Sequence, residues 1–201
     1  MKIHVNAPAR RSTALCRDRS AGGFTLLEVL VSIVVLSFGV LGVVGLQAAA
    51  LQANKEARYQ STAVALGREL GDLMRGNKGI AITTGTGNPY LVSWTSTAAL
   101  PTAPSCTPCA STTAVAQANM LDWLTRVKDA LPGVRVVVCF DAQPYGGSSG
   151  TGTPTWGCTN SGGLAVVKMG WTRQSTNRNA ADPEQAVRPI VVLPLVAGSA
   201  T

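Results

Sequence analysis

The most apolar segment of the chain lies near its amino terminus. Residues 24–46 form a run of 23 positions with a single charged residue, Glu28. An α-helix rises about 1.5 Å per residue, so about 20 apolar residues cross the roughly 30 Å hydrocarbon core of a bilayer. The run also exceeds the roughly 7 to 15 apolar residues of a signal peptide. The pattern therefore predicts a membrane-spanning helix over residues 24–46.

Beyond residue 46 the pattern becomes that of an amphipathic helix. Apolar side chains recur at steps of three and four residues, which places them on one helical face. These positions are Tyr59, Ala63, Leu66, Leu70 and Leu73. The glycine-rich residues 76–79 then predict the end of the helix. We expect one continuous helix from residue 24 to about residue 75, with the apolar stripe of its second half packed in a globular core.

The remaining residues, 77–201, alternate short apolar runs with turn-forming residues. A second helix is predicted over about residues 113–130, because Met120, Leu124 and Val127 share one face and Pro132 follows. Its tryptophan, Trp123, is expected in the core. Strands are predicted at residues 134–140, 165–172 and 189–193.

The predicted loops separate these elements. Residues 80–112 are expected to be mostly loop, with one short strand near Tyr90–Trp94. Residues 141–157 are rich in glycine and predict a flexible excursion, and residues 173–188 predict a solvated loop. The predicted fold class is α+β: a long amino-terminal helix, first transmembrane and then amphipathic, packed on a small antiparallel sheet.

The net charge of +7 is concentrated at the amino terminus. Residues 1–23 hold five basic residues and one acidic residue, so this leader carries +4 and the rest of the chain +3. Basic residues ahead of an apolar run place the amino terminus in the cytoplasm and predict export of the chain beyond the run. The basicity is therefore mostly a targeting feature, and no nucleic-acid partner is predicted.

Glu28 is the residue that a plain membrane anchor does not explain. A carboxylate at mid-helix in a membrane costs roughly 2.5 to 3.5 kcal/mol and usually has a partner or a function. Cleavage between Gly23 and Phe24 would create an α-amino cation four residues before Glu28, on the same helical face. That amine, on the same helix or on a neighbouring subunit, would neutralise the carboxylate. In the first helical turn, the macrodipole also favours its negative charge.

Residues 22–30 read GGFTLLEVL, and this segment resembles the class III signal of type IV prepilins and type II secretion pseudopilins. The resemblance implies that a prepilin peptidase in the inner membrane cuts after Gly23 and N-methylates Phe24. It further implies that Glu28 neutralises a neighbouring amino terminus during filament assembly. The chain would then divide into a cleaved leader (1–23), a transmembrane part (24–46), an amphipathic continuation (47–76) and a globular head (77–201).

Two further segments resemble the PilV family of minor pilins: residues 36–47, LSFGVLGVVGLQ, and Trp123 with the Leu-Pro-Gly of residues 131–133. The resemblance implies a minor pilin that helps to prime or modify pilus assembly and so supports adhesion or twitching motility. Its expected partners are prepilin peptidase, the inner membrane and other pilins, contacted through the amino-terminal helix. Its head would be periplasmic before assembly and would then lie in the pilus filament or at its tip.

Two alternatives remain open within this family. A minor pseudopilin of a type II secretion system has the same leader and the same glutamate as a pilin. An adhesin or a DNA-uptake pilin would use a surface of the head, to which Arg173, Arg178 and Arg188 could contribute a basic patch. A solvated face is the simpler interpretation of these three arginines.

Five cysteines are present, and Cys16 lies in the leader. The remaining four predict two disulfides in an oxidising compartment, and four cysteines allow three connectivities. The simplest pairs Cys139 with Cys158 across the glycine-rich excursion and Cys106 with Cys109. Cys106 and Cys109 also have the spacing of a redox-active pair, but no βαβ pattern surrounds them.

No cofactor, metal ion or enzymatic activity is expected. The single histidine, His4, lies in the leader, and the spacing between Cys139 and Cys158 does not match the close ligand pairs that are common in zinc sites. The sequence has no phosphate-binding loop, and its carboxylates are scattered. A catalytic centre cannot be assembled from these parts.

Overall fold

The computed structural model describes residues 22–146, 152–173 and 188–196. The chain forms two compact units, Met1–Ala48 and Ala49–Thr201. The prediction of an α+β fold is confirmed, because the chain combines a long amino-terminal helix with a small antiparallel sheet.

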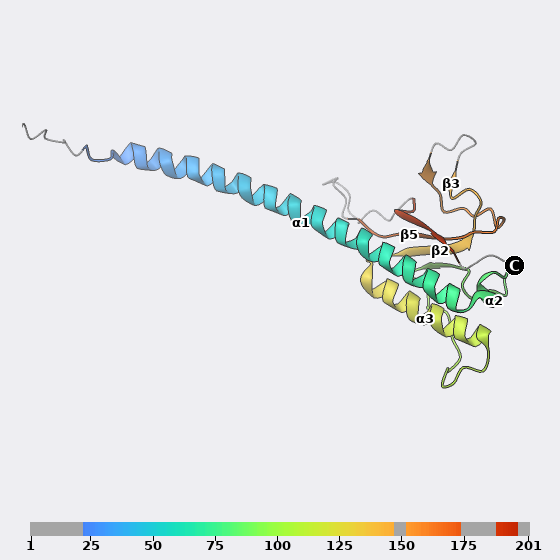
Figure 1. Cartoon of the computed structure of the whole chain (residues 1–201). Helices are drawn as coiled ribbons and strands as arrows, with labels where there is room; N and C mark the ends of the chain where they lie inside the picture. The colour runs from blue at the N-terminus through green and yellow to red at the C-terminus, as the bar shows by residue number, and fades with distance from the viewer. Residues whose placement is uncertain (1–21, 147–151, 174–187, 197–201) are drawn as a thin grey trace, which may run out of the picture. The chain divides into compact units, whose positions relative to one another are not determined.

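The long helix α1 spans Leu26–Gly76, which is 51 residues (Figure 1). No proline interrupts it, so its backbone hydrogen bonds can continue from the apolar run into the amphipathic stretch. The predicted end at residues 76–79 is confirmed, although a short unpredicted helix, α2 (Lys78–Ala81), follows at once. The helix begins at Leu26, two residues later than predicted.

The part of α1 in the first unit is exposed along its whole length, from Leu26 to Ala48. Its most apolar window has a mean hydropathy of 2.7 with no buried residue, and by length and composition the helix can cross a membrane. The hydroxyls of Ser32 and Ser37 donate to the carbonyls of Glu28 and Ile33, each at 2.7 Å. These polar groups are thus satisfied within the helix, as a hydrocarbon environment requires.

The second unit holds a four-stranded antiparallel sheet in the order β1-β2-β5-β6. Its strands are β1 (Val92–Thr95), β2 (Arg135–Phe140), β5 (Ala165–Gly170) and β6 (Val191–Leu195). All four predicted strands are confirmed with small shifts. The predicted strand over residues 165–172 ends early because the backbone N–H of Thr172 leaves the ladder and donates to the carbonyl of Pro132 at 2.9 Å.

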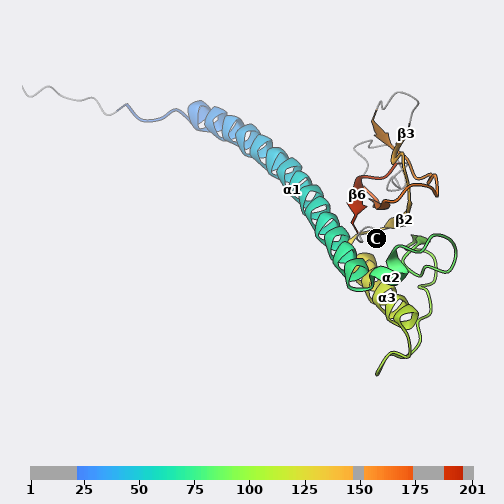
Figure 2. The same ribbon diagram turned by 45° about the vertical axis from the view of Figure 1, so that its right-hand side comes forward.

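The later part of α1 and helix α3 (Thr112–Ala130) cover one face of this sheet (Figures 1 and 2). α3 begins where the side chain of Ser111 accepts a hydrogen bond from the N–H of Ala114, which is a standard N-cap. The prediction that Trp123 belongs to the core is confirmed: it is fully buried, and its Nε1 donates to the carbonyl of Leu66 at 2.8 Å.

The predicted apolar stripe of α1 lies in this core. Ala63, Leu66 and Leu70 are buried, whereas Tyr59 and Leu73 lie half-buried at its border. Glycines complete the same face. A Cβ atom on Gly67 would lie 2.6 Å from the Leu193 side chain of β6, so the missing side chain allows helix and strand to approach closely.

The opposite face of the sheet carries a smaller cluster. Val137, Cys139 and Val166 are buried there beneath Trp156 and Cys158. The covering segment comes from residues 141–146 and 152–164 and contains a hairpin of β3 (Tyr145–Gly146) and β4 (Thr153–Pro154). This hairpin stands away from both helices in the two views (Figures 1 and 2).

The described part of residues 141–157, which the sequence predicts as a flexible excursion, instead contains regular structure. That part is paired as a hairpin and fixed to the sheet by side-chain contacts. Residues 147–151 lie outside the described residues. In the predicted solvated loop, Arg173 forms an ion pair with Glu56 at 2.8 Å, and residues 174–187, with Arg178, are also outside the description.

Candidate functional site

The first candidate site is the segment that leads into α1. Residues 22–25 precede the helix, and Thr25 caps it. The hydroxyl oxygen of Thr25 accepts a hydrogen bond from the N–H of Glu28 at 3.2 Å, and its carbonyl accepts from Glu28 and Val29 at 3.1 and 3.2 Å. An N-cap threonine satisfies N–H groups that the first helical turn leaves unpaired. The helix start is thus fixed directly after Gly23 and Phe24.

Glu28 is the third residue of α1 and lies in its first turn. The spacing Thr25 to Glu28 is that of a capping box, and the partial positive charge of the helix amino terminus favours a carboxylate there. Glu28 is exposed, and none of the ion pairs among the described residues includes it. Within the described part of the chain, the helix dipole is therefore what compensates the charge of Glu28.

Gly23 and Phe24 lie in the open, non-helical stretch before Leu26. Phe24 is 81% exposed, and a Cβ atom built on Gly23 would meet nothing within 4 Å. The bond between them is thus sterically accessible. The expectation that residue 24 and Glu28 share a helical face assumed a helix beginning at Phe24; in the uncut chain, Phe24 precedes the helix.

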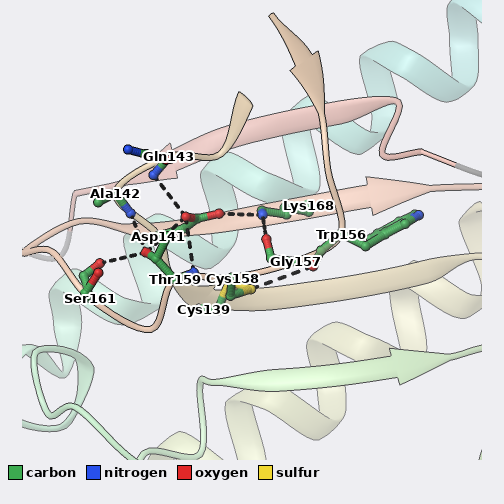
Figure 3. Close-up of a disulfide and its surroundings, with 10 residues drawn as sticks. All are labelled: Cys139, Asp141, Ala142, Gln143, Trp156, Gly157, Cys158, Thr159, Ser161 and Lys168. Atoms are coloured by element: carbon green, nitrogen blue, oxygen red, sulfur yellow. Dashed lines mark hydrogen bonds and ion pairs between the residues drawn. A yellow bond between two sulfur atoms is a disulfide. The ribbon is translucent and has the colours of Figure 1, made fainter. Parts of the chain in front are cut away.

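The four candidate cysteines form two disulfides, Cys106–Cys109 and Cys139–Cys158. Cys139 is buried in β2, and Cys158 lies half-buried in the segment that returns over the sheet. Figure 3 shows this second disulfide with its surroundings. It joins the sheet to its covering segment, so it closes the loop that the sequence predicted as a flexible excursion.

A buried ion pair lies next to the Cys139–Cys158 disulfide (Figure 3). The Nζ of Lys168 is 2.5 Å from Oδ2 of Asp141, and the two side chains are 0% and 1% exposed. Lys168 also donates to the carbonyl of Gly157. On its other oxygen, Asp141 accepts from the N–H of Gln143 at 3.0 Å and from Thr159. Both charges are therefore paired and hydrogen-bonded, as buried charges require.

These contacts set the charge state of Asp141. Burial alone raises the pKa of the carboxyl, but the hydrogen bond from Lys168 and those from the backbone of Gln143 and Thr159 lower it by more. The net pKa of Asp141 lies below its ordinary value, so this carboxyl is ionised at neutral pH. The arrangement holds the covering segment on the sheet through charge as well as through the disulfide.

Three potential metal-ligating residues, Cys139, Asp141 and Cys158, bring their side-chain atoms within 4.8 Å of one another. The two sulfur atoms are bonded to each other, and the carboxylate is bonded to Lys168. The proximity of the three therefore follows from the disulfide and the ion pair. We assign this cluster a structural role.

The pair of Asp141 and Lys168 was not predicted from the sequence. Its only sequence signal is a lysine inside an apolar strand pattern, Ala-Val-Val-Lys-Met at residues 165–169. Strand alternation places Lys168 on the same face as Val166, and both lie on the face that the returning segment covers. A charged residue in a buried strand predicts a buried partner, but the partner's position depends on how the segment after β2 folds back.

Comparison with family models gives one match, to the prokaryotic N-terminal methylation motif, over residues 18–44. The matched range contains Gly23, Phe24 and Glu28 and most of the exposed apolar part of α1. No curated protein and no solved structure matches the chain. The methylation motif implies processing by prepilin peptidase and a membrane-associated role, and with the capped helix start and the exposed apolar helix it indicates a type IV prepilin-like protein.

Proposed function

We propose that this chain is a minor pilin of a type IV pilus, similar to PilV, that helps to prime or modify pilus assembly. The observation that carries the proposal is the position of the methylation motif: it covers the accessible Gly23–Phe24 bond, the capped helix start and Glu28 in one continuous segment. Prepilin peptidase cuts that bond and methylates the new terminus at Phe24. The chain then acts as a structural subunit without a catalytic role.

Glu28 guides the assembly of the filament. The apolar part of α1 is exposed, and among the described residues Glu28 has no cationic partner. A charge in an apolar environment is costly unless it is paired. The amino terminus that processing creates at Phe24 of a neighbouring subunit supplies that pair, which selects a defined axial position between two helices.

The rest of the chain follows from this role. Residues 1–23 are the leader, residues 24–46 lie in the inner membrane before assembly, residues 47–76 continue the helix, and residues 77–201 form the exported head. Two disulfides suit an oxidising periplasm. Attachment or twitching motility would depend on the protein through its effect on pilus number.

The proposal is tested by intact-mass and amino-terminal peptide analysis of the protein from native membranes and from sheared pili. In the wild type we expect a terminus at Phe24 that carries one added methyl group. In Gly23→Ala we expect the full leader to remain. Recovery of the mature chain in sheared pili supports a pilin, whereas its restriction to membranes with loss of secretion on gene deletion identifies a type II secretion pseudopilin.

Substitutions of Glu28 separate processing from assembly. Glu28→Gln keeps the size and the hydrogen-bonding capacity of the side chain but removes its charge. We expect normal cleavage at Phe24 in this variant and a loss of the chain from sheared pili. An intact Met1 terminus in the wild type, or a cut beyond Leu46, would contradict the pilin proposal.

A further inference from the structure

Four basic side chains project from one end of the second unit. Lys55 and Arg58 lie on α1, Arg173 is the third residue after β5, and Arg188 is the third residue before β6. All four are exposed. We call these four residues the basal cluster, because they lie at the end of the unit where α1 enters it.

Contacts within the second unit bring these residues to a common end. The Nε1 of Trp171, just after β5, donates to Glu56 of α1 at 3.2 Å, and the Trp171 ring packs edge-on against Tyr59 at 6.4 Å between ring centroids. Strand β6 begins beside the end of β5, since Val191 pairs with Met169. The residues just before β6 and just after β5 therefore lie at the end of these two strands that is next to the start of the amphipathic stretch of α1.

The positive charge of the basal cluster is mostly uncompensated. Arg173 is 2.8 Å from Glu56, whereas none of the ion pairs among the described residues includes Lys55, Arg58 or Arg188. The last turn of α3 lies at the same end and adds Lys128 and Asp129, whose charges cancel. Three positive charges thus remain without an acidic partner among the residues that the structure describes.

The position of this charge along α1 relates it to the membrane. Lys55 follows the last residue of the apolar run, Leu46, by nine positions, which is about 13 Å of helix. The polar headgroup layer adds about 5 to 7 Å on each side of the hydrocarbon core. Lys55 would thus lie just outside that layer, within the roughly 8 Å over which charges act at physiological ionic strength. Arg58 lies three residues, or about 4.5 Å of helix, farther out. Long basic side chains can also reach back toward the headgroups.

We propose that the basal cluster binds the anionic phospholipid surface of the membrane that holds α1, and so seats the second unit on that membrane before assembly. This inference rests on the proposed membrane anchoring of the chain. Clustered lysine and arginine side chains near a membrane surface are attracted to acidic headgroups, each with an effect of about fivefold on the binding equilibrium. Release from the surface would then accompany transfer of the subunit into a filament.

Lysine reactivity offers a direct test on the full chain. The protein is reconstituted in vesicles of phosphatidylcholine alone or mixed with phosphatidylglycerol, and exposed amines are acetylated with a membrane-impermeant reagent and read by peptide mass spectrometry. We expect Lys55 to react at least about fivefold more slowly on the anionic vesicles than on the neutral ones. High salt, which shortens the screening length to about 3 Å at 1 M, is expected to remove this protection.

The chain supplies its own controls. Lys78 is exposed on α2, beyond the far end of α1, which extends about 31 Å from Lys55 to Gly76. Its reactivity is therefore expected to be the same in both lipids. Lys168 is fully buried and stays unreactive as long as the fold is intact. The double variant Arg58→Gln/Arg188→Gln is expected to lose most of the protection of Lys55. Its matched control, Arg68→Gln/Arg75→Gln, removes the same charge farther along the unit and is expected to keep it.

Several results would overturn the inference. Equal reactivity of Lys55 in both lipids is one, and protection that persists in high salt is another. Protection by double-stranded DNA but not by anionic vesicles would assign the cluster to nucleic acid. Flotation of the vesicles separates this outcome from a failure of the proposed function: a chain that floats without Lys55 protection contradicts the inference alone, whereas a chain that does not float contradicts both.

Discussion

The two stretches of α1 belong to one helix but differ in whether their apolar side chains are buried within the chain. In the first unit, Leu41 is 67% exposed, and the other residues of α1 from Leu26 to Ala48 are exposed as well. In the second unit, Leu70 is fully buried among α3 and the sheet. The helix therefore forms both where its apolar side chains are exposed and where they are buried. The second stretch finds its apolar partners within the chain, whereas the first stretch has the length and composition of a membrane span.

The two units also differ in the environment that each provides for a carboxylate. Asp141 in the second unit is buried and paired with Lys168. Glu28 in the first unit is exposed and, within the described part of the chain, has no ion-pair partner. A complete internal network stabilises one folded state, whereas an uncompensated charge on an apolar helix favours association with a cation outside the chain. The carboxylate of the second unit is thus paired within the chain, whereas under the proposed function Glu28 finds its partner in another subunit.

The largest difference in stability is expected when the two carboxylates are substituted. Asp141→Ala leaves the ammonium of Lys168 buried without its counter-ion, which is expected to lower the free energy of unfolding of the second unit by about 3 to 5 kcal/mol. Glu28→Ala is expected to change that free energy by less than about 0.5 kcal/mol. Urea unfolding in detergent micelles, followed by tryptophan fluorescence, measures both. Equal losses of unfolding free energy in the two variants would contradict this difference between the two units.

The matched leucines come next. Leu70→Ala creates a cavity in the core and is expected to lower the free energy of unfolding by about 3 kcal/mol. Leu41→Ala removes the same atoms from an exposed position and is expected to leave the unfolding of the second unit unchanged. Alanine is a strong helix former, so neither change breaks α1. Thermal unfolding by circular dichroism compares the two, and a large loss in Leu41→Ala would show that the first unit supports the fold.

The sequence predicted the elements of α1 and the core well, because each depends on a local pattern. The stripe of Ala63, Leu66 and Leu70 follows directly from helical spacing, and the strands follow from β-branched runs bounded by turns. The segment that carries the methylation motif was likewise readable from consecutive residues. Local rules of this kind need no knowledge of distant contacts.

The largest misses depend on contacts between distant residues. Asp141 and Lys168 are 27 positions apart, and their pairing depends on how the segment after β2 folds over the sheet. The same fold places Trp156 over Arg135, with 4.4 Å from the guanidinium carbon to the ring centroid. A glycine-rich sequence indicates a loop but does not show that its ends are fixed. Composition therefore predicted flexibility where long-range contacts impose order.

The two disulfides rank third in expected effect, and both lie in the second unit. In the loop-entropy account, the stabilisation grows with the length of the closed loop. Removal of Cys139–Cys158, which are 19 positions apart, by serine substitution of both is expected to cost about 3 kcal/mol. Removal of Cys106–Cys109, three positions apart, is expected to cost about 2 kcal/mol or less. Unfolding curves of the two double variants decide the order.

Accessibility gives this ranking an independent check. Cys106 and Cys109 are both partly exposed, whereas Cys139 is buried beneath the returning segment. A mild dithiol reductant is therefore expected to open the short loop first, with fluorescence of the buried tryptophans unchanged. Simultaneous opening of both disulfides would indicate that the returning segment gives no protection.

The smallest effect on stability is expected from a change in pH, and it is confined to acidic conditions. The pKa of Asp141 is lower in the folded state than its ordinary value of about 4. A carboxyl with a lowered folded pKa contributes stability that is fully present above the unfolded pKa and is lost as pH falls through the folded pKa. The free energy of unfolding is thus expected to be insensitive to this group above about pH 5 and to fall below about pH 4.

Asp141→Asn isolates this contribution, since it removes the titrating group and keeps the size of the side chain. We expect the variant to be less stable than the wild type at neutral pH and the difference to shrink as the pH is lowered below about 4, because the wild-type carboxyl then becomes neutral as well. Glu28→Gln is the matched control from the first unit, and its unfolding is expected to follow the wild-type pH profile. A constant difference between Asp141→Asn and the wild type down to acid pH would show that the pH dependence of folding does not come from Asp141.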